Sequence, residues 1–231
     1  EVGPVFFGKN PGEQQIVVGG LKSGLVSRKS WLEKSRNVDV FDIKRDVIRT
    51  LIDLGLEECD LIVSNNTKSC YHPGRSGSVN LKSEKGQHLA YFGELHPAII
   101  TNLDFKEKNI FGFEIFLKNI PKPNIKVRVS KKNYTTSDFQ KSERDFAFVI
   151  DKFFKVGELE NIIKKVDDNI LKKVITFDVF EGQNIPEGKK SVAINVVIQS
   201  QDKTLTESDL DQISQKIINT VKEKTGATIR S

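Results

Sequence analysis

The sequence has 231 residues, of which 37% are hydrophobic and 29% charged, with a formal net charge of +5. This length and composition predict one or two globular domains with a buried core. They exclude helical membrane spans, because no window approaches the ~18 apolar residues that such a span needs. Two cysteines are too few for a disulfide scaffold, so we expect a protein of a reducing compartment, the cytoplasm.

The positive net charge fits a polyanionic partner, although basic and acidic residues are mixed along the chain. The chain has no methionine, even at its first position. We therefore expect a piece of a longer protein, whose activity is shared with parts that lie outside this sequence.

The first half predicts α+β structure. The expected elements are a strand at 15–19, a helix at 42–54, a hairpin at 78–94 that turns at 83–86, a short helix from His96-Pro97 and a strand at 111–117. The longer helix is predicted from apolar residues at every third or fourth position, followed by Gly55 as a stop signal.

Residues 121–136 predict a linker between two domains. Pro121 and Pro123 disfavour both helix and central strand, and a polar, basic run follows at 130–133. We therefore expect one domain at 1–120 and another at 137–231.

The second half has a sharper pattern. Strands are expected at 145–150, 174–180, 191–199 and 227–230, and apolar stripes predict helices at 156–166 and 210–221. Thr206 and Asp209 are spaced as a capping box at the start of the second helix. The order βαββαβ predicts a ferredoxin-like domain, in which two helices cover one face of a four-stranded sheet.

Alternation along these strands assigns side chains to the two faces of the sheet. The helix side is expected to hold Val192, Ile194, Val196, Ile198, Phe146, Phe148 and Phe177. The open side is expected to show Asp145, Ala147, Val149, Thr176, Asp178, Phe180, Ser191, Ala193, Asn195, Val197 and Gln199. On this assignment Phe180 is the only ring on the open side, whereas RNA-binding sheets stack bases on several aromatic side chains.

An open sheet face in this fold can bind single-stranded RNA, or it can be solvated or covered by a protein partner. For RNA we expect contacts at the edge of the sheet and in loops. The candidates are Arg144, Lys189, Lys190 and Ser191 at the strand ends, Phe180 as the stacking surface, and Asn195 and Gln199 as groups that face the bases.

The sequence predicts no catalytic residue and no metal site. The segment 19–24, Gly-Gly-Leu-Lys-Ser-Gly, lacks the ending of a phosphate-binding loop and predicts a turn between strands. The cysteines and histidines lack the paired spacing of zinc ligands. His72 and Arg75 lie in a segment that predicts a tight turn, and they are also our candidates for a contact with another subunit.

Several segments resemble a known family in the same order along the chain. In the second half they are 142–149 (SERDFAFV), 177–182 (FDVFEG), 188–191 (GKKS), 202–206 (DKTLT) and 226–230 (GATIR). They resemble the ferredoxin-fold anticodon-binding domain that ends the β subunit of bacterial phenylalanyl-tRNA synthetase. In the first half, 39–44 (DVFDIK), 71–76 (YHPGRS) and 93–97 (GELHP) resemble the catalytic-like module that precedes this domain.

The resemblance implies a degenerate class II synthetase module, built on an antiparallel sheet, that packs against the catalytic α subunit and does not itself activate phenylalanine. It implies a heterotetramer of two α and two β subunits, tRNA(Phe) as the RNA partner, and ATP and Mg²⁺ bound on the other subunit rather than on this chain. The earlier parts of the β subunit, including its editing region, would be missing here.

Two other readings stay open. Both domains could serve assembly alone, as an interaction module without direct RNA contact, or the chain could be an RNA-binding protein of another pathway.

Overall fold

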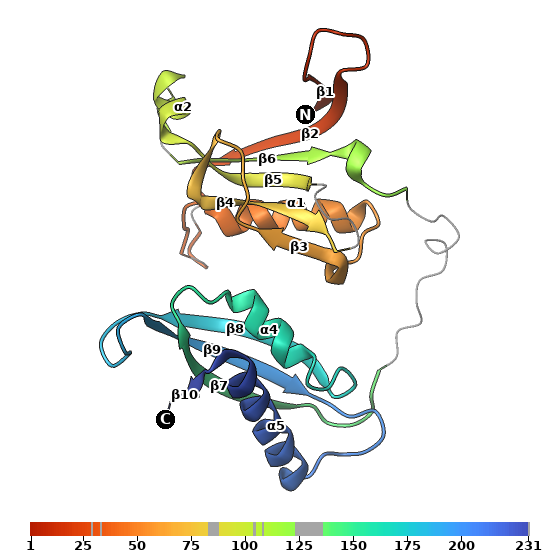
Figure 1. Cartoon of the computed structure of the whole chain (residues 1–231), viewed down its shortest axis with the longest axis vertical. Coiled ribbons are helices and arrows are strands. Elements are labelled where there is room, and N and C mark those ends of the chain that lie inside the picture. Colours follow the sequence, from red (N-terminus) through yellow and green to blue (C-terminus); the bar gives the residue numbers. More distant parts are fainter. Residues whose placement is uncertain are drawn as a thin grey trace. The chain divides into compact units, whose positions relative to one another are not determined.

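The structure, a computed structural model, describes residues 1–28, 30–32, 34–82, 88–103, 105–107, 109–122 and 136–230. The predicted hairpin turn at 83–86 and residues 123–135 of the predicted linker lie outside the described residues. The chain divides into two compact units, Glu1–Lys132 and Asn133–Ser231 (Figure 1). We call them the N-terminal unit and the C-terminal unit.

The N-terminal unit is built on an antiparallel sheet with the strand order β1-β2-β6-β5-β4-β3. Its elements are β1 (Val2–Phe6), β2 (Gln14–Ser23), α1 (Val40–Asp53), the short 3₁₀ helix Glu58–Asp60, β3 (Leu61–Ser64), β4 (Tyr71–Leu81), β5 (His88–Leu95), α2 (Pro97–Asn102), β6 (Ile110–Phe116) and a second 3₁₀ helix, Leu117–Asn119. Helix α1 packs its apolar stripe of Ile43, Val47 and Leu51 against the sheet, which confirms the predicted amphipathic helix.

The predicted turn at 19–24 is wrong. Strand β2 continues through Gly19 to Ser23, where Gly20 pairs with Phe113 and Leu21 with Gly112 of β6. The strand continues because β6 supplies the backbone hydrogen bonds for this segment. The glycines of the segment favour a turn locally, and the sequence gives no sign of the distant strand that pairs with them.

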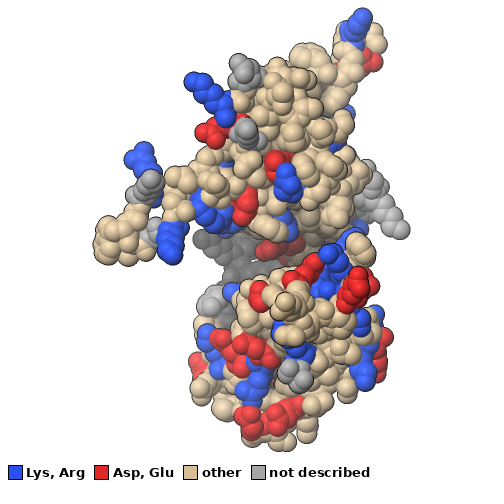
Figure 2. Space-filling view, turned by 90° about the vertical axis from the view of Figure 1, so that its left-hand side faces the viewer, with Lys and Arg blue, Asp and Glu red and all other residues tan. Residues whose placement is uncertain are grey.

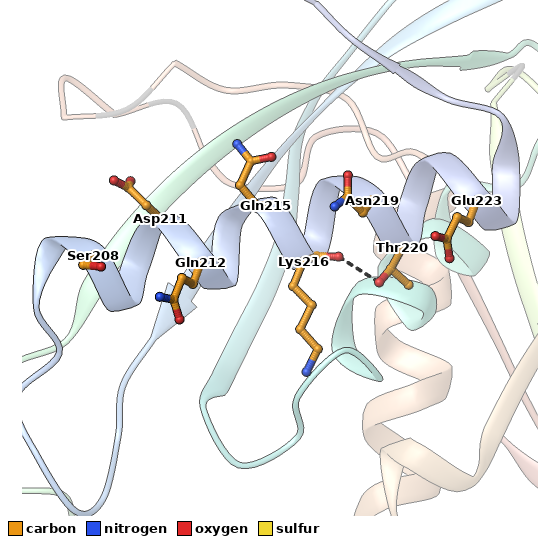
Figure 3. Close-up of a pocket in the computed structure, with 8 residues that line it drawn as sticks. All are labelled: Ser208, Asp211, Gln212, Gln215, Lys216, Asn219, Thr220 and Glu223. Carbon is orange, nitrogen blue, oxygen red and sulfur yellow. Dashed lines mark hydrogen bonds between the residues drawn. The ribbon is translucent and has the colours of Figure 1, made fainter.

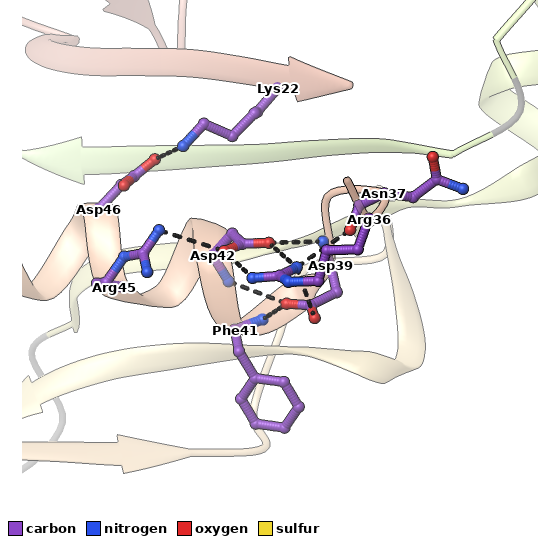
Figure 4. A network of polar contacts seen from close by, with 8 residues as sticks. All are labelled: Lys22, Arg36, Asn37, Asp39, Phe41, Asp42, Arg45 and Asp46. Atoms are coloured by element: carbon purple, nitrogen blue, oxygen red, sulfur yellow. Dashed lines mark hydrogen bonds and ion pairs between the residues drawn. The ribbon is translucent and has the colours of Figure 1, made fainter. Parts of the chain in front are cut away.

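The start of α1 is fixed by a network of carboxylates and arginines (Figure 4). Asp39 and Asp42 form a capping box, in which each side chain accepts from the backbone N–H of the other residue. Arg36 donates from Nη1 and Nη2 to the two carboxylate oxygens of the buried Asp42, both at 2.7 Å. These bonds favour the charged form and hold the pKa of Asp42 well below its usual range. The loop before α1 is thereby tied to the helix.

The C-terminal unit contains the predicted βαββαβ order. Its elements are β7 (Ser142–Asp151), α4 (Val156–Lys164), β8 (Leu171–Phe180), β9 (Lys189–Ile198), α5 (Glu207–Thr225) and β10 (Thr228–Ile229). The sheet is antiparallel with the order β10-β7-β9-β8, and both helices lie on one of its faces (Figure 1). Leu159 and Ile163 of α4 and Ile217 and Val221 of α5 are fully buried in the core beneath them. The fold is the ferredoxin-like one expected from the sequence.

Strand β8 departs from the expected alternation. Its register against β9 shifts between Thr176 and Asp178, so that Phe177 is an extra residue in the strand. The Thr176 hydroxyl donates to Oε1 of Glu160 in α4 at 2.8 Å, which places Thr176 on the helix side. Phe177 is 58% exposed. The predicted positions of Thr176 and Phe177 are therefore both wrong, because the bulge reverses the alternation at this point.

Candidate nucleic-acid interface

None of the described helices covers the second face of the C-terminal sheet, and the strand register defines how its side chains are arranged. Along β9, the residues Ser191, Ala193 and Asn195 lie on this open face. Their partners in β8 are Phe180, Asp178 and Ile175, and their partners in β7 are Val149, Ala147 and Asp145. Small alanine side chains thus occupy the middle of the face, and Phe180 and Asp178 stand beside them.

Phe180 is the aromatic side chain that the sequence singled out. Its ring is 41% exposed. The guanidinium carbon of Arg230 lies 5.8 Å from the ring centroid, in a cation–π contact. Gly182 lies at the tip of the ring, since a Cβ built at this glycine would come within 2.9 Å of Cζ of Phe180. The ring is therefore held from two sides and still presents surface to solvent.

The two amide side chains that we expected to face bases are engaged within the domain. Nδ2 of Asn195 donates to Oδ1 of Asp145 at 2.7 Å, and Nε2 of Gln199 donates to the carbonyl of Phe139 at 2.7 Å. These bonds join residues far apart in the sequence, so the strand pattern alone gives no sign of them.

The candidate cations lie at strand ends, on two different faces. Arg144 in β7 pairs with Val196, and Lys190 in β9 pairs with Ile150; both partners are buried on the helix side. Arg144 also forms an ion pair with Glu207, the first residue of α5. Lys189 is two residues from Ser191 in β9, so its side chain lies on the same, open side. Because β7 and β9 are the central strands, the expected position at the edge of the sheet is wrong.

The sequence reading missed Arg230 on this face and the exposure of Phe177 in β8. The exposure of Phe177 was missed because the bulge in β8 interrupts the alternation from which its position was predicted. Arg230 follows β10, and its place beside Phe180 depends on the pairing of β10 with β7, which no local pattern reports. Its position in the GATIR segment was the one available signal.

The side of the molecule drawn in Figure 2 has no single basic surface. Basic and acidic residues are interspersed on the face that Figure 2 shows. Asp145 and Asp178 accompany Lys189 and Arg230 on the open face of the sheet. Stacking and hydrogen bonding, rather than a broad positive field, are the chemistry that this face offers to a ligand.

In the N-terminal unit, His72 and Arg75 lie in a bulge of β4. The register of β4 against β5 shifts between Tyr71 and Ser76, and Nδ1 of His72 accepts from the backbone N–H of Gly74 at 3.0 Å. Nη2 of Arg75 donates to Oε1 of Glu94 at 2.9 Å. This pairing lowers the pKa of Glu94. Arg75 thus has a carboxylate partner inside its own unit, and it remains half exposed.

A hollow among the described residues lies on the helix side of the C-terminal unit. It has a volume of about 610 Å³ and runs along the outer side of α5, lined by polar residues of that helix alone, among them Gln215, Lys216 and Asn219 (Figure 3). Among the described residues, no group of three or more His, Cys, Asp or Glu side chains is placed to hold a metal ion. None of the described helices is both long enough and apolar enough to span a membrane.

Comparisons with known proteins agree with this architecture. Residues 137–230 match a family model described as the ferredoxin-fold anticodon binding domain. Residues 1–117 match the model of the phenylalanyl tRNA synthetase beta chain CLM domain. The chain belongs to the family of phenylalanyl-tRNA synthetase β chains.

Curated relatives of the same family align with the whole of this chain. The chain is 35% identical over 230 residues to the phenylalanine–tRNA ligase β subunit of Paramagnetospirillum magneticum, and 38% identical over 234 residues to that of Cereibacter sphaeroides. Each alignment covers 100% of this chain and 28% of the relative. The chain therefore spans little more than a quarter of the length of the proteins that it resembles.

Proposed function

We propose that this chain is the part of a phenylalanine–tRNA ligase β subunit that binds the anticodon arm of tRNA(Phe) and supports the catalytic α subunit. The observation that carries the proposal is the uncovered sheet face around Phe180, in a domain of an anticodon-binding family. Bases of single-stranded RNA stack on exposed rings and hydrogen-bond to nearby polar groups. The intact enzyme would be a cytoplasmic heterotetramer of two α and two β subunits.

The face around Phe180 fits a splayed base. A base that stacks on the ring would lie over Ala147 and Ala193, whose small side chains leave room for it. Asp178, paired with Ala193, offers carboxylate oxygens that can accept from the amino and imino groups of a base edge. A carboxylate in this position favours a base with donors, such as guanine, over one that presents only acceptors.

Helix α1 supplies a surface that suits the catalytic subunit. Its outer side forms a hollow of about 550 Å³ lined by apolar and basic residues: Phe41, Lys44, Arg45, Ile48, Arg49 and Ile52, together with Glu58. Phe41 points away from the polar network at the start of the helix (Figure 4) and is highly exposed. A partner with an acidic, amphipathic surface complements this side of α1. We propose His72 and Arg75 as further contacts with that subunit.

RNA binding is tested with an isolated anticodon stem-loop of tRNA(Phe), titrated with the full chain at several salt concentrations. We expect Lys189→Ala, on the open side, to weaken binding and to lower the slope of log affinity against log salt by about 0.7, the value for one lost phosphate contact. Lys190→Ala, at a position on the helix side, should have the smaller effect. Asn195→Ala should change the preference among anticodons, because it frees Asp145 and removes an amide beside the bases.

Lys164→Ala, at the exposed end of α4, is the control on the helix side. If Lys189→Ala and Asn195→Ala bind like the parent while the control loses binding, the RNA surface lies on the other face of the domain.

We propose that the chain has no synthetase activity by itself, and that ATP and Mg²⁺ bind to the catalytic subunit. The purified chain should show no phenylalanine-dependent exchange of pyrophosphate into ATP, and aminoacylation should require the catalytic subunit and the rest of the β subunit. Exchange by the chain alone would contradict this proposal.

An assembly role without RNA contact is the second candidate. It is favoured by the edge strand β8, where Ile175, Phe177 and Val179 are exposed and could be covered by protein. A complex with the catalytic subunit, formed by a chain that shows no salt-dependent binding to the stem-loop, would support this role over RNA recognition.

A further inference from the structure

Arg230 meets Phe180 over the open face of the C-terminal sheet, although the two residues belong to opposite edges. Its backbone N–H donates to the carbonyl of Ala147 in β7 at 2.8 Å, so its main chain lies at the β10 edge. Its guanidinium lies over Phe180, which belongs to β8 at the opposite edge. The guanidinium and the ring therefore meet over the central part of the sheet, where the alanine pair Ala147 and Ala193 leaves room for them.

The guanidinium has no other engagement in the described part of the chain. The backbone bond to Ala147 and the contact with the Phe180 ring are the interactions that Arg230 makes among the described residues. Arg144, by comparison, is held by the carboxylate of Glu207. An arginine without a carboxylate partner keeps its planar set of N–H donors available, and this set matches the oxygens of a phosphate group.

A stacked base and the guanidinium need the same part of the ring. Gly182 closes the tip of the ring, and the guanidinium lies 5.8 Å from the ring centroid. A base that stacks on the side of the Phe180 ring that the guanidinium covers displaces Arg230. The exchange is favourable because base stacking on an aromatic side chain is the stronger of the two contacts. The displaced cation stays tethered beside the ring, at the distance of the phosphates that flank the stacked base.

We infer that Arg230 is a phosphate-binding residue of this RNA surface: it occupies Phe180 in the free protein and pairs with an RNA phosphate when a base takes its place. The inference rests on the proposed function and adds a residue and a step to it. In the free protein the guanidinium also holds the ring in the orientation that a base requires, which reduces the ordering cost of binding.

The test uses the full chain and the anticodon stem-loop of tRNA(Phe) at several KCl concentrations, with three variants. Arg230→Gln keeps most of the side chain and removes the charge, so we expect affinity to fall about 5-fold to 10-fold and the salt slope to fall by about 0.7, the value for one phosphate contact on single-stranded RNA. Arg230→Lys should retain the parent slope with weaker binding, because an ammonium keeps the charge and loses the planar donors. Phe180→Leu should weaken binding and leave the slope unchanged.

Lys224→Gln, in the last turn of α5, is the matched loss of one charge away from the open face, and it should bind like the parent. An unchanged slope in Arg230→Gln, with binding by the parent intact, overturns the inference alone and reduces Arg230 to a support for the ring. Absence of salt-dependent binding by the parent overturns the proposed function and the inference with it. Equal thermal unfolding of all variants shows that each slope is measured on folded protein.

Discussion

At the scale of single residues, the two units depend on side chains whose partners are distant in the chain. Asp42 is 2% exposed and accepts from Arg36 in the preceding loop, and it also caps α1. A buried carboxylate is expensive unless its oxygens are paired, and here both oxygens accept from one guanidinium. The pair therefore fixes the angle at which the loop enters the helix as well as stabilising the helix.

We predict that Asp42→Asn lowers the free energy of unfolding of the N-terminal unit at pH 7 by about 2 kcal/mol, the sum of a lost charge-assisted bond and a weakened cap. Because the pKa of Asp42 is lower in the folded than in the unfolded chain, its contribution is present above pH ~4 and is lost as the pH falls. The difference between parent and variant should therefore shrink below pH ~4. Urea unfolding at several pH values measures it.

Glu107→Gln, an exposed carboxyl-to-amide change in the same unit, is the control and should change the free energy of unfolding by less than about 0.5 kcal/mol. A difference between parent and Asp42→Asn that stays constant from pH 7 to pH 3 would contradict the assigned role of the charge.

At the scale of elements, the bulge in β8 changes what the sheet presents. A regular strand would bury Phe177 under the helices, whereas in the bulged strand this residue is exposed. Thr176, which is hydrogen-bonded to Glu160, takes the position on the helix side that alternation predicts for Phe177. The bulge thus leaves an exposed apolar ring on the edge strand of the sheet.

We predict that Phe177→Ala changes the free energy of unfolding of the C-terminal unit by no more than about 0.5 kcal/mol, because the ring is 58% exposed and leaves no cavity. Phe148→Ala is the matched comparison: its ring is 1% exposed, and its removal should cost about 3–5 kcal/mol. Denaturant unfolding of both variants measures these changes in the free energy of unfolding. Equal decreases for the two variants would mean that Phe177 is part of the core.

At the scale of the whole molecule, the division into two units has a consequence for proteolysis. Their boundary falls between Lys132 and Asn133, inside the segment that the sequence predicts as a linker. Each unit has its own apolar core, one beneath α1 and the other beneath α4 and α5. A domain with a complete core can fold without its neighbour.

We predict that limited trypsin digestion cuts near Lys131 and Lys132 and releases a C-terminal piece that unfolds cooperatively. Mass spectrometry identifies the cut, and thermal unfolding followed by circular dichroism measures the cooperativity of the isolated piece. Loss of all structure on separation would show that the two units form one cooperative domain.

The order of elements in the C-terminal unit was determined by the sequence alone. The stripes of Leu159 with Ile163 and of Ile217 with Val221 depend only on residues within one helix, and the capping box of Thr206 and Asp209 spans three residues. Local spacing of this kind is set by the backbone geometry of a single element. Strand β1, which contains a glycine and a proline, and the four-residue β3 were missed because they carry too short or too broken a pattern.

The composition of the candidate site was decided by tertiary structure. Arg230 meets Phe180 only because β10 pairs with β7 across the sheet, and Asn195 is bonded to Asp145 only because β7 and β9 pair in one register. Arg75 and Arg144 likewise find carboxylates in other elements. Such contacts depend on strand register and on a bulge, and a shift of one residue would turn each side chain to the opposite face. The alternation of the sequence determines which side chains can share a face, and packing between distant strands decides which of them touch.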